Sequence, residues 1–181
     1  MSGRKLCLRR SRWRYPSRTA LALRRFLVLA LLLAGTAQAA NSDALFAAKL
    51  DSSDGKVVAL ESYRGKPLIV NFWARWCAPC RVEIPELVKT QDKYRKRGLV
   101  VIGIGLEDKA ESVRDFMKAY EMSYTVLLAR DGGIELMKAL GNTRAGLPFT
   151  VAIDRRGEIV AIKLGAMNRS ELDAAGEAAL K

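Results

Sequence analysis

The chain has 181 residues, half of them hydrophobic, which allows one globular domain plus a short extra segment. Its formal net charge is +12, from 31 basic and 19 acidic residues. With no histidine and only three cysteines, it lacks the four nitrogen or sulfur ligands that a closed structural zinc site requires.

The positive charge is concentrated at the N-terminus. Residues 1–39 contain nine basic residues and no acidic one, and the remaining chain is nearly balanced at +3. The basic part ends at Arg24-Arg25, an apolar core follows at residues 26–34, and small residues lead to Ala37-Gln38-Ala39. This pattern predicts a signal peptide over residues 1–39, removed on export, and a mature domain over residues 40–181.

Two other interpretations of this segment are weaker. The uncharged stretch of residues 26–40 has 15 residues, while a helix that spans a bilayer takes about 20, so a retained membrane tether is the less favoured alternative. Residues 9–18 interleave arginines with Trp13 and Tyr15, as nucleic-acid-binding segments do. Their place ahead of an apolar export core favours a signal, so we expect no nucleic-acid partner and a periplasmic or other extracytoplasmic location.

The mature domain opens with short strands. Residues 44–50 and 56–60 flank an Asp-Gly turn and predict a β-hairpin, and residues 61–66 follow as a loop or a single helical turn. Residues 67–74, "PLIVNFWA", form an almost continuous apolar run rich in β-branched and aromatic residues. Such a run predicts a central strand buried on both faces.

Helices and strands alternate after this point. A helix is expected from Cys80 to Arg97, with Pro79 near its start, a kink at Pro85 and Gly98 at its end. Residues 170–180 predict a closing helix that Ser170 caps. The other predicted elements are a strand at 99–106, helix 110–120, strand 125–129, helix 134–140 and a hairpin of 149–154 with 158–165. The fold class is therefore α/β, with a central mixed β-sheet flanked by helices.

Only two cysteines, Cys77 and Cys80, remain after Cys7 leaves with the signal. A disulfide between them closes a very short loop and so constrains the unfolded chain little, which argues against an inert structural bridge. The pair alone cannot complete a zinc site. Redox chemistry is the favoured interpretation, with metal carriage and an inert bridge as alternatives.

The two cysteines lie at a predicted junction between a strand and a helix, and this position favours thiol–disulfide exchange. Cys77 precedes the predicted helix, whose free N–H groups and dipole favour a thiolate. Cys80 lies one turn further on, close enough to resolve a mixed disulfide at Cys77. We expect Trp76 to pack beside the sulfurs and to offer substrates an apolar face, and Trp73 to belong to the core.

Two stretches resemble thioredoxin. "NFWARWCAPC" after a buried strand resembles its active site, and residues 146–150, "GLPFT", resemble the loop whose cis-proline faces the disulfide. The resemblance implies a cis bond between Leu147 and Pro148. It also implies that the backbone of Leu147 pairs with an extended substrate segment, as in strand addition.

Residues 44–180 resemble the TlpA/ResA-like family of exported thioredoxin-like oxidoreductases. The likeness rests on the N-terminal β-hairpin, a central helix-strand insert at about 107–129, and Cys77-x-x-Cys80-x-x-Glu83. Thioredoxin carries a buried Asp where this chain has Asn71, and the resemblance implies that Glu83 handles the proton instead. A carboxylate three residues after Cys80 lies on the same helix face and, with a raised pKa, accepts a thiol proton near neutrality. The alternative is that Glu83 merely favours the first turn of its helix.

The dipeptide Ala78-Pro79 resembles the Gly-Pro of reductants more than the Pro-His of a strong oxidant. We therefore expect a reductase of client protein disulfides. The resemblance implies a role in cytochrome c or oxidase copper-site maturation, and electrons from a membrane thiol donor. No cofactor is expected. A disulfide-forming oxidant and a copper-binding metallochaperone that uses Cys77 and Cys80 as soft ligands remain alternatives.

Overall fold

A seven-stranded mixed sheet organises the part of the chain that this computed structural model describes, residues 42–106 and 109–181. The predicted signal peptide, residues 1–39, lies outside the described residues. The strands run in the order β2-β1-β5-β4-β3-β6-β7. They are β1 (Lys49–Ser52), β2 (Val57–Ala59), β3 (Leu68–Trp73), β4 (Val100–Gly105), β5 (Thr125–Leu128), β6 (Phe149–Ile153) and β7 (Ile159–Leu164).

Strand β3 lies between β4 and β6, where the parallel part of the sheet meets the antiparallel part. It pairs in parallel with β4, which pairs in parallel with β5, while β6 and β7 continue antiparallel on the other side. Every residue of β3 is buried, as its apolar run predicts. The mixed α/β fold predicted from the sequence is therefore confirmed.

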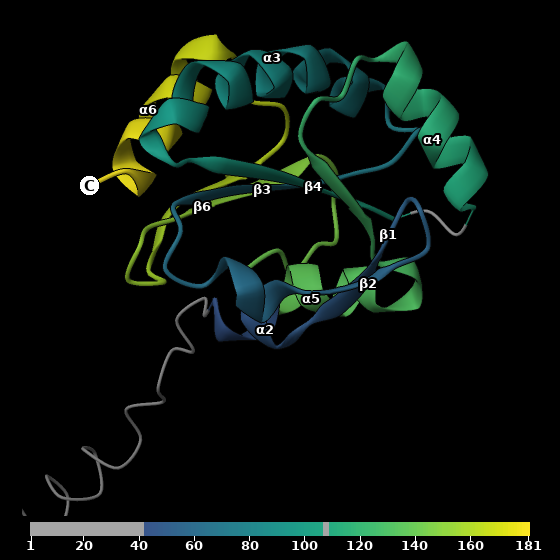
Figure 1. The fold of residues 1–181 in the computed structure, drawn as a ribbon, viewed down its shortest axis with the longest axis horizontal. Helices are drawn as coiled ribbons and strands as arrows, with labels where there is room; N and C mark the ends of the chain where they lie inside the picture. The colour runs from purple at the N-terminus through teal and green to yellow at the C-terminus, as the bar shows by residue number, and fades with distance from the viewer. Residues whose placement is uncertain (1–41, 107–108) are drawn as a thin grey trace, which may run out of the picture. The chain divides into compact units, whose positions relative to one another are not determined.

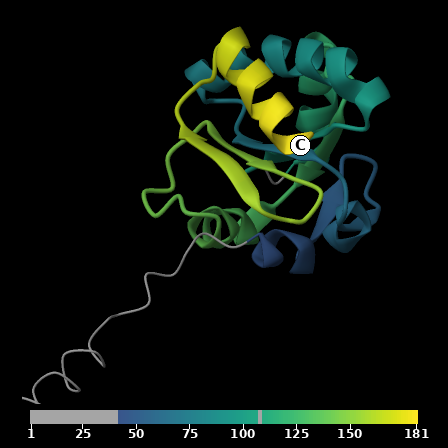
Figure 2. The same ribbon diagram turned by 90° about the vertical axis from the view of Figure 1, so that its left-hand side faces the viewer.

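Helices cover both faces of the sheet, as Figure 1 shows. On one face lie α3 (Ala78–Tyr94), α4 (Ala110–Ala119) and α6 (Arg169–Ala179), and Figure 2 shows α6 beside α3. On the other face lie α2 (Asp43–Ala47) and α5 (Gly133–Ala139). Short 3-10 turns occupy Leu60–Tyr63, Arg95–Arg97 and Arg130–Gly132. Among the described residues, no helix combines the length and apolar character needed to cross a membrane.

The side chains of β3 alternate between two cores. Ile69 and Trp73 pack under α3, α4 and α6, while Val70 and Phe72 pack on the α2 and α5 side. Asn71 points to the same face as Ile69 and Trp73, because successive side chains of a strand alternate. This polar residue therefore lies beneath α3, in a layer whose other β3 side chains are apolar.

The predicted insert is present as α4 and β5. Strand β5 pairs with β4 on one side and with β1 on the other, so the N-terminal hairpin joins the sheet through the insert. Phe116 of α4 stacks on Trp73, with 5.1 Å between ring centroids. Helix α4 thereby closes one end of the core that contains the cysteines.

Two local predictions were wrong. Residues 43–47 form helix α2 and not the start of a strand. The helical conformation of this short apolar run allows Leu45 and Phe46 both to be buried. The cap of α6 is Asn168, whose side chain accepts from Glu171 N at 3.0 Å while the Glu171 carboxylate accepts from Asn168 N at 2.9 Å. Ser170 instead donates to Asn168 Oδ1 at 2.8 Å.

Helix α3 begins two residues before its predicted start. It is continuous through Pro85 and passes into the 3-10 turn Arg95–Arg97. Gly98 follows in the left-handed region, at a φ of 90°, which glycine adopts without strain. The predicted end of the helical segment is therefore correct.

Candidate active site

The two cysteines lie where β3 passes into α3. Cys77 is the N-cap residue of α3, and its Sγ accepts from the backbone N–H of Cys80 at 3.3 Å. A disulfide joins Cys77 and Cys80, whose Cα atoms are 5.3 Å apart. Cys77 is 5% exposed and Cys80 1%, so Cys77 offers the more accessible sulfur. The free N–H groups of the first turn stabilise a thiolate at Cys77 once the disulfide is reduced.

Glu83 lies one turn after Cys80 and is buried, with 1% of the residue exposed. Its Oε2 accepts from Asn71 Nδ2 at 2.9 Å, and its Oε1 accepts from the backbone N–H of Met167 at 2.9 Å. The Thr150 hydroxyl lies 3.5 Å from Oε1 and accepts from Asn71 Nδ2 at 2.8 Å. Both carboxyl oxygens are therefore held in place by neutral donors.

Burial raises the pKa of the Glu83 carboxyl, and the negative charge of Glu171 acts in the same direction. The hydrogen bonds from Met167, Asn71 and Thr150 oppose this rise by stabilising the carboxylate. The net pKa remains above the ordinary value of a glutamate. Such a carboxyl is a stronger base than an exposed one and suits proton exchange with a thiol near neutral pH.

The predicted cis bond is present between Leu147 and Pro148. Pro148 is buried, and Leu147 is half-buried against the cluster of core residues that includes both cysteines. Pro148 directly precedes β6, whose Thr150 contacts the Glu83 carboxyl. Strand β6 thus connects the cis-proline loop to the Glu83 carboxyl.

The sequence profile of the Redoxin family matches residues 38–178. The chain belongs to the Redoxin family. Among similar relatives, the thiol-disulfide oxidoreductase ResA of Bacillus thuringiensis is 29% identical over 120 residues, covering 66% of this chain and 67% of ResA. The thioredoxin-like protein YneN of Bacillus subtilis is 32% identical over 126 residues, covering 68% of this chain and 71% of YneN.

A solved thioredoxin-family thiol:disulfide interchange protein from Chlorobium tepidum has the same fold. It gives a TM-score of 0.64 at 32% identity, over 74% of this chain and 93% of that one. This redoxin is thus a thiol–disulfide oxidoreductase with a thioredoxin-like fold, of the TlpA/ResA-like type. Its substrates are therefore proteins that carry cysteines.

The two tryptophans of the redoxin motif differ sharply. Trp73 is fully buried in the core, as predicted, whereas Trp76 is 72% exposed. Trp76 therefore presents its ring to solvent directly before Cys77. The role in substrate binding that the sequence suggests for Trp76 stays a prediction.

Two contacts of Glu83 were not predicted from the redoxin sequence. Thr150 and Met167 lie 67 and 84 positions from Glu83, and no local pattern connects them. Thr150 reaches the site because it pairs in register with Asn71 across β6 and β3. Met167 reaches it through the segment between β7 and α6. The missing information was the β-sheet register for Thr150 and the path of the loop for Met167.

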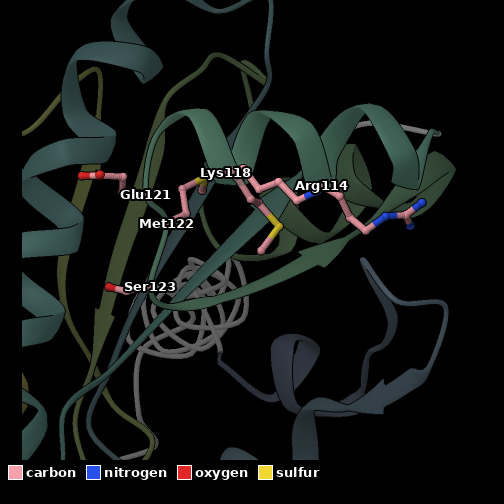
Figure 3. A pocket seen from close by; sticks show the side chains of 6 residues that line it. Arg114, Lys118, Glu121, Met122 and Ser123 are labelled. Atoms are coloured by element: carbon pink, nitrogen blue, oxygen red, sulfur yellow. The ribbon is translucent and has the colours of Figure 1, made fainter.

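An open groove along the end of α4 is separate from the redox pair. Figure 3 shows its lining side chains, and none of them belongs to the cysteine motif or to the cis-proline loop. They are Arg114, Met117, Lys118, Glu121, Met122 and Ser123. The chemistry of this redoxin therefore lies outside the groove.

Proposed function

We propose that this protein is an exported reductase of client protein disulfides, of the type used in cytochrome c or oxidase copper-site maturation. The observation that carries the proposal is the buried Glu83 carboxylate, which follows Cys80 by one helical turn and accepts from Asn71 at 2.9 Å. This arrangement provides a base for the cysteine that must lose its proton during turnover.

In the proposed reaction, the Cys77 thiolate attacks a client disulfide. The Cys77–client disulfide bond forms as the client S–S bond breaks, and the first client thiolate leaves. Cys80 then loses its proton to Glu83 and attacks Sγ of Cys77. The Cys77–Cys80 disulfide forms, the second client thiolate leaves, and two electrons have passed to the client.

The direction of electron flow follows from the local chemistry. The thiolate of Cys77 is stabilised by the helix N-terminus, and the chain has no histidine to stabilise it further. A less stabilised thiolate makes the dithiol a stronger reductant, and Ala78-Pro79 is similar to the dipeptide of reductants. Reduction potentials range from about −270 mV for thioredoxin to about −120 mV for the oxidant DsbA.

Client binding is assigned to Trp76, Leu147 and Pro148. The exposed Trp76 ring offers an apolar contact, and the backbone of Leu147 offers hydrogen bonds to an extended client segment. Residues 1–39 direct export, and a membrane thiol donor re-reduces the disulfide because an extracytoplasmic compartment is kept oxidising. If the signal is retained, the same segment tethers the protein.

The test is the reduction potential of the Cys77/Cys80 couple, measured by equilibrating the protein with glutathione buffers and alkylating free thiols. A value at or below about −230 mV supports a reductase. A value near about −120 mV identifies a disulfide-forming oxidant instead.

The same titration tests the copper-carrier alternative. Tight Cu(I) binding with no reversible two-thiol titration would favour it. Among residues 42–106 and 109–181, no group of three or more His, Cys, Asp or Glu side chains is placed to hold a metal ion. Copper carriage would thus depend on the two thiols alone or on a ligand from a second molecule.

A further inference from the structure

Three buried polar atoms beneath α3 have no hydrogen-bond partner among the described residues: Asn71 Oδ1, Trp73 Nε1 and Tyr124 Oη. Asn71 and Trp73 are fully buried, and Tyr124 is 5% exposed. Buried polar groups in folded proteins nearly always form hydrogen bonds, to protein or to an ordered water. Because the three atoms lie in one core layer, a single hydrogen-bonding partner shared by all three would satisfy them.

These side chains meet over Gly103 of β4. Asn71 pairs directly with Gly103 across β3 and β4. A Cβ atom at Gly103 would lie 2.9 Å from Tyr124 Cε2 and 3.1 Å from Trp73 Nε1. The missing side chain of Gly103 thus lets the phenol ring and the indole nitrogen approach the strand beside Asn71. The same asparagine donates to Glu83 through its other side-chain atom, Nδ2.

We propose that Tyr124 is a positioning residue for Glu83: its hydroxyl, the Trp73 indole N–H and Asn71 Oδ1 bind one ordered water that links the phenol to the Asn71–Glu83 hydrogen bond. The three atoms are complementary for this purpose, because an indole N–H only donates, an amide oxygen only accepts and a phenol does both. A buried water typically makes about three hydrogen bonds, which matches this set. The inference rests on the proposed proton role of Glu83.

The surroundings of Tyr124 keep its phenol hydroxyl uncharged. Burial raises the pKa of Tyr124, and the charge of Glu83 raises it further, so the hydroxyl remains protonated and able to donate. The other titratable groups around Glu83 are the thiols of reduced Cys77 and Cys80 on α3, and Glu171, which pairs with Lys163. A donor network that ends on Asn71 stabilises the Glu83 carboxylate, so loss of the phenol hydroxyl raises the pKa of Glu83.

The first test follows resolution by Cys80 in the reduced full-length protein carrying Cys7→Ser, in which Cys77 and Cys80 are the only thiols. Mixed with one equivalent of dithionitrobenzoate, the dithiol releases one aromatic thiolate when Cys77 attacks and a second when Cys80 resolves the mixed disulfide. For Tyr124→Phe we expect the second phase to slow roughly 3- to 10-fold at neutral pH, with its pH profile displaced to higher pH. The matched control is Tyr94→Phe, a buried tyrosine at the far end of α3 whose hydroxyl donates to Asp173 at 3.2 Å. Superimposable second-phase profiles for Tyr124→Phe and wild type would overturn the inference.

The second test needs no turnover and is independent of the direction of electron flow. In the oxidised protein, carbon-13 NMR follows the Glu83 carboxyl, assigned with Glu83→Gln. An upward displacement of its titration in Tyr124→Phe, but not in Tyr94→Phe, supports the inference; no displacement overturns it. A measured potential typical of an oxidant would change the proposed function and leave this result intact.

A third measurement uses only the wild-type protein, so it does not depend on the folding of a variant. Magnetisation transfer from a long-lived water to the Trp73 indole proton is expected. Its absence, with the Trp73 signal resolved, would overturn the proposed water.

Discussion

The side-chain amide of Asn71 donates to Oε2 of Glu83 at 2.9 Å and so joins the central strand to the helix that carries Cys80. Because an asparagine does not ionise, Asn71 fixes the carboxylate without competing with it for a proton. Glu83 can then titrate as a single buried group whose pKa burial raises.

Replacing Glu83 by Gln removes the proposed base and keeps the shape of the side chain. We expect the second phase of aromatic thiolate release to slow roughly 10- to 100-fold, because Cys80 must then lose its proton to water. The first phase, attack by Cys77, should remain within about twofold of wild type, since it precedes proton transfer from Cys80. Stopped-flow absorbance resolves both phases. Equal slowing of the two phases would show that Glu83 acts on Cys77 as well or only through the fold.

The raised pKa of Glu83 also predicts how stability depends on pH. Between the ordinary pKa of 4.5 and the higher folded-state pKa, the folded chain binds more protons at Glu83 than the unfolded chain does. The contribution of this group to the free energy of unfolding therefore falls as pH rises through that window, by at most about 1.4 kcal/mol per pH unit. Urea unfolding at a series of pH values should show Glu83→Gln gaining stability relative to wild type from pH 4 upward. A constant difference across this range would mean that Glu83 is not desolvated.

Cys80→Ser should trap the reaction halfway. Cys77 remains able to attack, and no second thiol resolves the product, so a Cys77-linked mixed disulfide accumulates. In a Cys7→Ser background, intact mass spectrometry after mixing with a disulfide substrate should report one added substrate half per chain. The matched variant Cys77→Ser should give little adduct, because Cys80 is the more buried cysteine. The opposite outcome would reverse the roles of the two sulfurs.

The exposed Trp76 should affect client affinity and not folding. Since its ring is 72% exposed, Trp76→Ala should change the free energy of unfolding by less than about 0.5 kcal/mol. Loss of an aromatic contact of about 1–2 kcal/mol would raise KM for a protein disulfide roughly 5- to 30-fold with little change in kcat. The control is Val57→Ala in β2, also an exposed apolar residue, at 67%. Steady-state kinetics that leave KM unchanged for Trp76→Ala would remove Trp76 from the client site.

Gly103 offers a test of packing beneath the active site. An added methyl group would lie 2.9 Å from Tyr124 Cε2 and 3.1 Å from Trp73 Nε1, so Gly103→Ala should lower the free energy of unfolding by about 1–3 kcal/mol. Gly132→Ala is the control, because a Cβ there meets nothing within 4 Å and its φ of −82° suits alanine. Denaturant unfolding of both variants gives the comparison. Equal stability would mean that Tyr124 and Trp73 move aside freely.

The sequence predicted most of the framework, because its strongest signals are local. The apolar run of β3, the cysteine spacing and the turn between β6 and β7 each fix their structure within about ten residues. The start of α2 was mistaken for a strand, since a short apolar run has no distinguishing period. At α6, both Asn168 and Ser170 are suitable caps by residue type, and only the position of Glu171 favours Asn168.

The site was predicted along α3 and at the cis-proline loop. The spacing of Cys77, Cys80 and Glu83 is visible in the sequence, because helix geometry relates neighbours three residues apart. Thr150 and Met167 could not be found in this way, since their contacts with Glu83 depend on sheet register and on the path of a loop. Tyr124 is hidden for the same reason: it is 21 positions from Gly103, and the two meet only because the residue before β5 is brought next to β4 when these strands pair.

The hydrogen-bonding partners of Glu83 come from β3, β6 and the segment before α6. They come together only when the β-sheet and the segment before α6 have formed. An unfolded chain has the same two cysteines as ordinary thiols, with neither a helix N-terminus at Cys77 nor a buried carboxyl at Glu83. Its thiols would exchange slowly and without selectivity. With Glu83 in its proposed role, we expect rapid resolution by Cys80 only in molecules that have reached the native topology, so that the rate of this step reports the fraction of correctly folded protein.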